Sequence, residues 1–391
     1  MRNHRIVIIL SVIGIVIIGS HYMLWALLIR DTLLPDDFRR LLLSAYFVIL
    51  VLFMGTRICL RDSVHWSGWP GYTMLGFVSI LVICVCIAYP ARLLLQEGFH
   101  LAGIAFDPSR ELLFVRVLGG AAAISAGVLA IMGMRNAIAE PCVSEVEIPL
   151  TRLPPELDGY TIVHISDVHL GRTIGRAFAE RIVRIANSLH GDLISITGDL
   201  VDGSVDQLRD VVAPFGGLRA RHGVWLVTGN HEYYVDVNSW IMKLNHMGIR
   251  VLRNERVAIG SDAVGFDLAG VDDWEANVEG HGHDLGRALE GCNASRLLVL
   301  LAHQPRSVVE ASELGVDLQL SGHTHGGQLW PGNWFVRLQQ PYVAGLHLHN
   351  DTYLYVNRGA GYWGPPMRVG SKPEIARVVL RFVKEKSSRD R

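Results

Sequence analysis

The sequence predicts a chain of two parts, an N-terminal region of four transmembrane helices followed by a water-soluble α/β domain. The 391 residues are 50% hydrophobic and only 19% charged, whereas a soluble domain carries about 25% charged residues. Long uncharged runs give way near residue 140 to short apolar segments separated by glycine-rich turns. With only five cysteines in the chain, a small fold held together by disulfide bonds is excluded.

Four apolar runs precede residue 140, and each can cross most or all of a hydrocarbon core about 30 Å thick, at about 1.5 Å per helical residue. We predict spans at about 6–29, 41–60, 71–89 and 112–134. The first run also resembles a cleaved signal peptide, but it is too long for one and three further spans follow it. Residues 1–140 are therefore expected to form the transmembrane region of a multi-pass protein of the cell membrane.

The arginines between these spans do not determine their orientation. If the N-terminus is cytoplasmic, five arginines lie inside and six outside, which is too small a difference for the positive-inside rule. The side of the membrane that the soluble domain faces stays open, as does the oligomeric state.

The soluble domain is expected to cover residues 141–383, followed by a charged tail at 384–391. Short apolar segments predict strands at 160–166, 192–197, 223–228, 264–270, 296–302, 317–320, 352–357 and 374–382. A helix is predicted between the first two strands, because Ile174, Phe178, Ile182 and Ile185 recur at helical spacing. Alternation of strands with helical segments is typical of an α/β domain.

Polar clusters come directly after five of these strands, where α/β sheets place their binding sites. The clusters lie at 166–169, 198–202, 229–232, 302–304 and 321–327. Each combines a carboxylate, amide or imidazole with a glycine or a turn. Any one cluster alone is weak evidence, because such residues are common at turns and surfaces, but five in one chain point to a single site.

The side chains of these clusters are nitrogen and oxygen donors for divalent metal ions. They comprise two aspartates, one asparagine and four histidines: Asp167, His169, Asp199, Asn230, His303, His323 and His325. This set is unlike a closed structural zinc site with thiolates. It suits two ions about 3.5–4 Å apart that share one aspartate, an arrangement used for phosphoester hydrolysis.

The order of these motifs resembles the calcineurin-like metallophosphoesterase superfamily over roughly residues 150–383. The run Gly-His-Thr-His-Gly-Gly-Gln at 322–328, with Asn357-Arg358-Gly359 and Pro365-Pro366 downstream, resembles its bacterial membrane-associated branch, which includes lipid-precursor pyrophosphatases and broad phosphodiesterases. The resemblance implies two β-sheets packed face to face with helices outside.

Carried over residue by residue, the resemblance implies how two divalent ions are held. One ion would be bound by Asp167, His169, Asp199 and His325, and the other by Asp199, Asn230, His303 and His323. We expect Mn²⁺, and the donors also suit Fe, Zn or Co. His231 would assist the leaving group or hold phosphoryl oxygens, and Asp202 would orient it, although Asp202 as a simple turn residue is an equal alternative.

Several other branches of the superfamily fit less well. Purple acid phosphatases have tyrosine where Asp202 stands, and protein phosphatases follow that aspartate with Arg-Gly, whereas this chain has Gly203-Ser204. Residues 141–391 carry 25 basic and 29 acidic residues, which disfavours a nuclease and any nucleic-acid partner.

We therefore expect a membrane-anchored two-metal hydrolase. Its substrate would be a phosphodiester or pyrophosphate, lipid-linked if the aromatic loop at 326–335 meets the bilayer, and the reaction would proceed by attack of a metal-bound hydroxide. Trp330, Trp334 and Phe335 in that loop either pack over the sheet edge or face the lipid. The alternative is a membrane transporter or sensor whose metal-binding domain is regulatory, but the spans contain few ionisable groups.

Overall fold

The computed structural model describes residues 19–384, apart from 45–64, 105–106, 262, 277 and 279. The chain divides into two compact units, Met1–Met134 and Arg135–Arg391.

Two helices of the described residues are long and apolar enough to cross a membrane, Trp69–Leu101 within α3 (His65–Leu101) and Pro108–Ile138, which is α4. At about 1.5 Å per residue they extend roughly 50 and 45 Å, beyond the hydrocarbon core of about 30 Å. Only 17% and 22% of their most apolar stretches are buried, whereas the core helix of a soluble protein is mostly buried. The predicted spans 71–89 and 112–134 lie within these helices.

The other two predicted spans, 6–29 and 41–60, lie largely outside the described residues. A π-helical turn, η1 (Ala26–Arg30), overlaps the end of the first predicted span. Two of the four predicted spans therefore correspond to apolar helices of the described residues, and the other two remain predictions.

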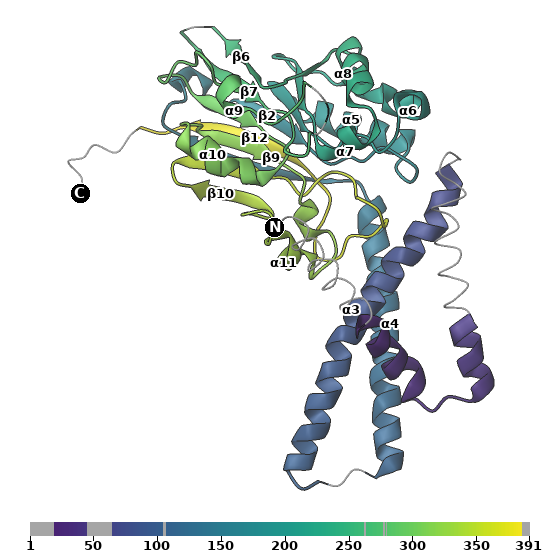
Figure 1. The fold of residues 1–391 in the computed structure, drawn as a ribbon. Coiled ribbons are helices and arrows are strands. Elements are labelled where there is room, and N and C mark those ends of the chain that lie inside the picture. Colours follow the sequence, from purple (N-terminus) through teal and green to yellow (C-terminus); the bar gives the residue numbers. More distant parts are fainter. Residues whose placement is uncertain are drawn as a thin grey trace. The chain divides into compact units, whose positions relative to one another are not determined.

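The second unit contains two six-stranded β-sheets (Figure 1). The first has the order β1-β12-β2-β3-β4-β5, with bounds β1 (Cys142–Leu150), β12 (Glu374–Phe382), β2 (Thr161–Ile165), β3 (Leu193–Thr197), β4 (Val224–Val227) and β5 (Ile249–Val251). The second has the order β10-β11-β9-β8-β7-β6, with bounds β10 (Gly345–His349), β11 (Thr352–Val356), β9 (Leu318–Ser321), β8 (Leu298–Leu301), β7 (Gly265–Gly270) and β6 (Glu255–Gly260).

The sheets pack face to face, as the resemblance implied. Apolar side chains from both sheets share one buried cluster, in which Ile162 and Trp225 of the first sheet join Phe266, Val299 and Leu320 of the second. Strand residues that point the other way, such as Val163 and Ile165, belong to a separate core, because successive side chains of a strand alternate between its faces.

Helices cover the outer faces of both sheets (Figure 1). The α-helices of this unit are α5 (Arg176–Ser188), α6 (Val205–Val212), α7 (Asn230–Val235), α8 (Val237–His246), α9 (Leu285–Ala288), α10 (Val308–Glu313) and α11 (Gly332–Val336). Short 3₁₀ turns are η2 (Pro155–Leu157), η3 (Ala213–Gly217), η4 (Pro305–Ser307) and η5 (His325–Gly327). The apolar face predicted for α5 is confirmed, since Phe178, Ile182 and Ile185 are buried.

The strand directions bring the polar clusters to one edge of the sandwich. In the first sheet β2, β3 and β4 run parallel, and in the second β7, β8, β9 and β11 run parallel. The carboxyl ends of parallel strands lie at the same edge of a sheet. The loops that follow these strands therefore come together where the two sheets meet.

Candidate metal centre

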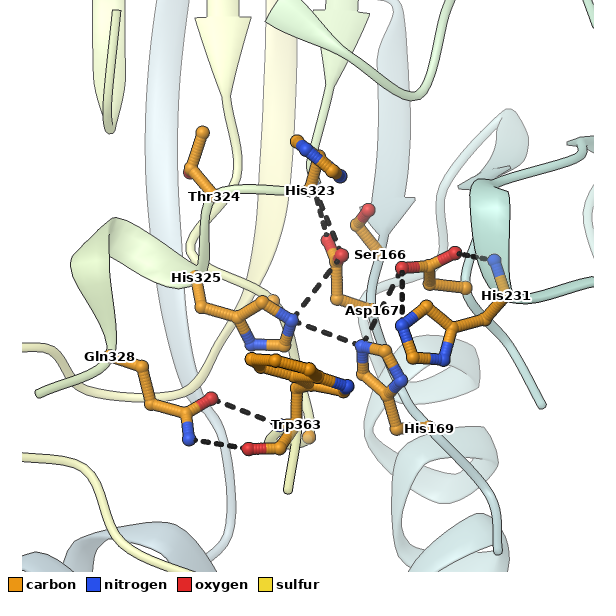
Figure 2. A network of polar contacts seen from close by, with 12 residues as sticks. Ser166, Asp167, His169, His231, His323, Thr324, His325, Gln328 and Trp363 are labelled. Atoms are coloured by element: carbon orange, nitrogen blue, oxygen red, sulfur yellow. Dashed lines mark hydrogen bonds and ion pairs between the residues drawn. The ribbon is translucent and has the colours of Figure 1, made fainter. Parts of the chain in front are cut away.

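All seven predicted metal-binding side chains lie within four residues of the end of a strand. Asp167 and His169 follow β2, Asp199 follows β3, and Asn230 begins α7 after β4. The second sheet contributes His303 after β8, and His323 and His325 after β9. Both sheets thus supply donors to one cluster (Figure 2).

Five of these residues have a left-handed backbone. The φ angles are 51° for Asp167, 52° for His169, 51° for Asp199, 70° for His323 and 51° for His325. A positive φ is uncommon outside glycine and persists where the surrounding structure enforces it, often at functional sites. The turns after β2, β3 and β9 are therefore shaped to direct side chains, at a cost in backbone strain.

Two glycines allow the strand ends to approach one another closely. A Cβ atom on Gly322 would lie 2.2 Å from Oδ2 of Asp167, and one on Gly229 would lie 2.2 Å from Oδ1 of Asp199. Both distances are shorter than any van der Waals contact. The backbone of His323 uses this approach to donate its N–H to both carboxylate oxygens of Asp167, at 3.0 and 2.9 Å.

One end of the cluster, which we call the Asp167 end, consists of Asp167, His169 and His325. The two imidazole Nε2 atoms lie 3.0 Å apart, and Nε2 of His325 is 3.5 Å from Oδ1 of Asp167 (Figure 2). Asp202 accepts a hydrogen bond from Nδ1 of His169 at 2.8 Å. Burial acts to lower the pKa of His169, but Asp202 and Asp199 overcome it and raise this pKa to about 9, so the ring would release its Nε2 proton on binding a cation. The lone pair then left on Nε2 faces the cluster, which is the usual arrangement of a metal-binding histidine.

The other end, which we call the Asn230 end, consists of Asn230, His303 and His323. Oδ1 of Asn230 lies 3.2 Å from Nε2 of His303 and 3.1 Å from Nδ1 of His323. Nδ1 of His303 donates to the backbone carbonyl of Thr197 at 2.7 Å, so its Nε2 is unprotonated in the neutral ring. The amide of Asn230 donates through Nδ2 to the hydroxyl of Tyr234, which directs its oxygen toward the two imidazoles.

Asp199 lies between the two ends. Its Oδ2 is 3.7 Å from Nε2 of His169 and 3.3 Å from Nε2 of His303. Nitrogen and oxygen donors from both ends thus converge on this carboxylate, and they are of the types that bind divalent cations. The donors present therefore fit two divalent ions that share Asp199.

The electrostatics of the cluster favour an ionised Asp199. Burial acts to raise the pKa of this carboxyl, but the imidazoles of His303, His231 and His169 overcome it and hold the pKa well below its usual range. Burial raises the pKa of Asp167, which has less compensation. Of the two carboxylates, Asp199 is thus the one whose ionised form, which a cation needs, is more strongly favoured.

His325 and His303 differ in charge preference. Burial, together with the charges of His169 and Arg368, lowers the pKa of His325 well below its usual range. Burial acts in the same direction on His303, but Asp199 raises the pKa of that imidazole well above its usual range. His325 is therefore neutral, whereas His303 would release a proton on binding a cation.

His231 and Asp202, predicted as catalytic residues, contact each other at the rim of the cluster. Oδ1 of Asp202 accepts from Nδ1 of His231 at 2.7 Å and also from His169. Nε2 of His231 is 3.9 Å from Oδ2 of Asp199, and its side chain is 15% exposed. Asp202 thus joins His231 to the Asp167 end, which argues against a simple turn role for this aspartate.

Glu232 is a residue of the site that sequence reasoning missed. Its buried carboxylate accepts the backbone N–H groups of Gly229 at 2.7 Å, Asp199 at 3.0 Å and Leu200 at 2.8 Å. Burial and the charge of Asp199 raise its pKa to about 7. The signal was available, because a glutamate three residues after the N-cap residue, here Gly229, is typical of a capping box.

Arg368 is a second residue that was missed, and no sequence motif pointed to it. Its fully buried guanidinium donates to the carbonyl oxygens of Arg358, Gly361 and His325, and lies 3.1 Å from Nδ1 of His325. Burial lowers its pKa to about 10. It holds the 358–361 loop against the Asp167 end.

Comparison with known proteins agrees with this geometry. The family model described as calcineurin-like phosphoesterase matches residues 160–327. The chain is similar to "Transmembrane protein with metallophosphoesterase domain" from Bos taurus, with 38% identity covering 86% of this chain and 78% of that protein. The protein of the same name from Danio rerio is 35% identical, covering 96% of this chain and 90% of that protein.

A bacterial relative extends the comparison. An uncharacterised metallophosphoesterase of Helicobacter pylori is 38% identical over 63% of this chain and 66% of its own length. The predicted resemblance to calcineurin-like metallophosphoesterases is confirmed, and this bacterial relative is consistent with the predicted branch.

Proposed function

Because the chain belongs to the calcineurin-like phosphoesterase family of metal-dependent phosphoesterases, we propose that it is a membrane-anchored two-metal hydrolase of phosphodiesters or pyrophosphates. The observation that carries this proposal is the convergence of lone pairs from two groups of side chains on the shared carboxylate of Asp199.

The donors divide between two ions. Asp167, His169, Asp199 and His325 would hold one ion, and Asp199, Asn230, His303 and His323 the other. When bound, such ions orient phosphoryl oxygens, lower the pKa of water and offset the charge that develops during in-line displacement. Mn²⁺ is our first choice, with Fe, Zn or Co as the other ions that this donor set suits.

His231 is the residue that would handle the leaving group. Burial acts to lower the pKa of His231, but Asp202 and Asp199 overcome it and raise this pKa, which favours the protonated ring. With Nδ1 held by Asp202, the second N–H of that ring, at Nε2, can donate a proton to the departing oxygen or a hydrogen bond to the phosphoryl group. A general acid of this kind matters for an alkoxide or phosphate leaving group, which departs more easily when it is protonated.

The hydrolase is tested with the full chain in detergent. Metal-free protein is loaded with Mn²⁺, Fe²⁺, Zn²⁺ or Co²⁺, its metal content is measured, and it is assayed on bis(p-nitrophenyl) phosphate and on p-nitrophenyl phosphate. We expect two ions per chain and faster cleavage of the diester. Protein that binds no divalent ion and cleaves neither compound would refute the proposal.

We further propose that the substrate is linked to a lipid, and the exposed aromatic loop supports this proposal. The side chains of Trp330, Trp334 and Phe335 are 47%, 63% and 68% exposed, so they do not form core. Their loop begins at the η5 turn that carries His325. Tryptophan favours the interface between lipid and water, and the chain supplies two apolar helices that tether it to a bilayer.

The lipid contact is tested with the double variant Trp330→Ser/Trp334→Ser. We expect a loss of activity on a phosphodiester or pyrophosphate lipid in vesicles and unchanged activity on bis(p-nitrophenyl) phosphate. Met242→Ser is the matched control, because it removes a similarly exposed apolar side chain from α8. Equal loss on both substrates, with a lower melting temperature, would assign the aromatic rings to structure.

A further inference from the structure

Trp363 is a large apolar residue that is exposed beside the candidate metal centre. Its side chain belongs to the cluster drawn in Figure 2 with His169, His231 and His325. The indole and the imidazole of His231 meet edge to face, with ring centroids 6.3 Å apart. Trp363 is nevertheless 57% exposed, so most of its surface faces solvent.

The backbone of Trp363 is held by the side chain of Gln328. The amide Nε2 of Gln328 donates to the carbonyl oxygen of Trp363 at 2.7 Å, and the N–H of Trp363 donates to Oε1 of Gln328 at 2.9 Å (Figure 2). One amide side chain thus forms the pair of hydrogen bonds that a neighbouring strand would form. The two residues are separated by 35 positions in the sequence.

Gln328 is itself fixed to the turn that carries a predicted ligand. Its backbone N–H donates to the carbonyl oxygen of His325 at 3.1 Å, and its carbonyl oxygen accepts from Val369 at 2.8 Å. The position of Trp363 is therefore coupled through Gln328 to the position of His325. The prolines at 365 and 366 further stiffen the segment after Trp363.

An exposed indole ring on a rigidly held backbone contributes little to the stability of the fold. An indole that only served the fold would be buried, because its apolar area is among the largest of any side chain. Among the described residues the indole N–H of Trp363 has no hydrogen-bond acceptor. Both the ring face and the N–H are thus free to contact a ligand. The Gln328 hydrogen bonds already hold the backbone of Trp363 in place, which reduces the entropy cost of ordering this segment when a ligand binds.

We propose that Trp363 is a substrate-contacting residue that packs against the apolar ester group next to the scissile phosphorus, and that Gln328 is a positioning residue that presents it. The proposal rests on the proposed phosphoesterase function and narrows its substrates to those with an aryl or alkyl group on the phosphate. His231, which Trp363 meets edge to face, is the residue proposed to act on the leaving group.

The contact is tested with two diesters that share one leaving group, phenyl p-nitrophenyl phosphate and methyl p-nitrophenyl phosphate. We expect wild type to favour the phenyl compound in kcat/KM, mainly through KM. Trp363→Ala should lower this preference by about tenfold, Trp363→Phe should restore most of it, and Gln328→Ala should lower it in part. Met242→Ser is the control.

Binding supplies a readout that does not require turnover. We expect phenylphosphonate to bind wild type more tightly than methylphosphonate, and Trp363→Ala to remove the difference while metal content stays at the wild-type level. An unchanged phenyl-to-methyl ratio in Trp363→Ala, in kcat/KM and in binding, would overturn the contact. If wild type cleaves neither diester, the proposed function fails, and the phosphonate titration still decides the contact.

Discussion

The Asp167 end and the Asn230 end of the metal centre share Asp199, yet their other donor side chains are held by different groups. At the Asp167 end the supporting groups are charged, because Asp202 accepts from His169 and the guanidinium of Arg368 lies against His325. At the Asn230 end they are neutral, namely the carbonyl oxygen of Thr197 and the hydroxyl of Tyr234.

Because of this difference, we expect the two ends to respond differently to the loss of a supporting group. Removing one partner of a buried charged pair leaves an uncompensated charge, whereas a neutral hydrogen bond contributes only about 1 kcal/mol net. We therefore expect the Asp167 end to be the more sensitive of the two, and the following variants test that expectation.

Asp199→Asn should have the largest effect, because it weakens both ends at once. We expect loss of both ions and a fall in activity of more than roughly 10⁴-fold, beyond the loss of a general acid. Metal content and cleavage of bis(p-nitrophenyl) phosphate are measured together, with Asn230→Ala as the variant that weakens mainly one end. Equal metal content in Asp199→Asn and wild type would show that Asp199 is not the bridge.

His231→Ala should separate chemistry from metal binding. We expect near-normal metal content and activity lower by roughly 10²–10⁴-fold, the range for a lost general acid. The comparison is made at saturating metal, so that weak binding cannot imitate a catalytic defect. Loss of an ion from this variant would instead make His231 a ligand of the Asp167 end.

Asp202→Asn tests the charged support of the Asp167 end. The asparagine is nearly isosteric but lacks the charge that Nδ1 of His169 and of His231 now face. We expect metal affinity at one site to fall by roughly 10–100-fold, measured by competition with a chelator. Unchanged affinity would mean that Asp202 serves the backbone turn alone.

Tyr234→Phe applies the same test to the neutral end. It removes the hydroxyl that accepts from Nδ2 of Asn230 and leaves the ring in place. A net loss of about 1 kcal/mol corresponds to roughly fivefold weaker metal binding at one site. A larger effect than that of Asp202→Asn would reverse the proposed order of the two ends.

His164→Gln should have the smallest effect on activity and a measurable effect on stability. His164 is fully buried in β2, where its Nε2 lies 2.8 Å from Oγ1 of Thr197. Burial lowers its pKa to about 3. Between pH 6.5 and 3 the histidine is therefore protonated in the unfolded chain and neutral in the folded chain. Stability is therefore lost as the pH falls through this window.

From pH 7 to 5 this histidine alone should lower the free energy of unfolding by roughly 2 kcal/mol. His164→Gln should flatten that part of the pH dependence in thermal unfolding of the detergent-solubilised chain. His190→Gln, at an exposed histidine, is the matched control. The same slope in all three proteins would show that His164 does not contribute.

Much of the sandwich could be predicted from local patterns. The eight strands expected between 160 and 382 correspond to β2, β3, β4, β7, β8, β9, β11 and β12, because buried strands read as short apolar runs. The four strands that no apolar run indicated, β1, β5, β6 and β10, are the edge strands of the two sheets, and their sequences are more polar or shorter. An edge strand is partly exposed to solvent, so polar residues interrupt the continuous apolar run by which a buried strand is predicted.

The donors of the site could be predicted because each stands beside a strand end and has metal-binding chemistry. Arg368 and the Gln328–Trp363 pair could not, because their importance depends on contacts between segments that no local pattern relates. Glu232 lies between these cases, since its capping position is local but its bonds to Asp199 and Leu200 are not.

The place of β12 in the first sheet has a consequence for biosynthesis. β12 pairs with β1 on one side and with β2 on the other, although it follows β2 by about 210 residues. At roughly 5–20 residues per second, the ribosome needs about 10–40 s to supply it after β2. Until then the facing edges of β1 and β2 are unpaired, and such edges readily join a foreign strand. A nascent chain in this interval is therefore the form most exposed to aggregation, and the form on which a chaperone would act.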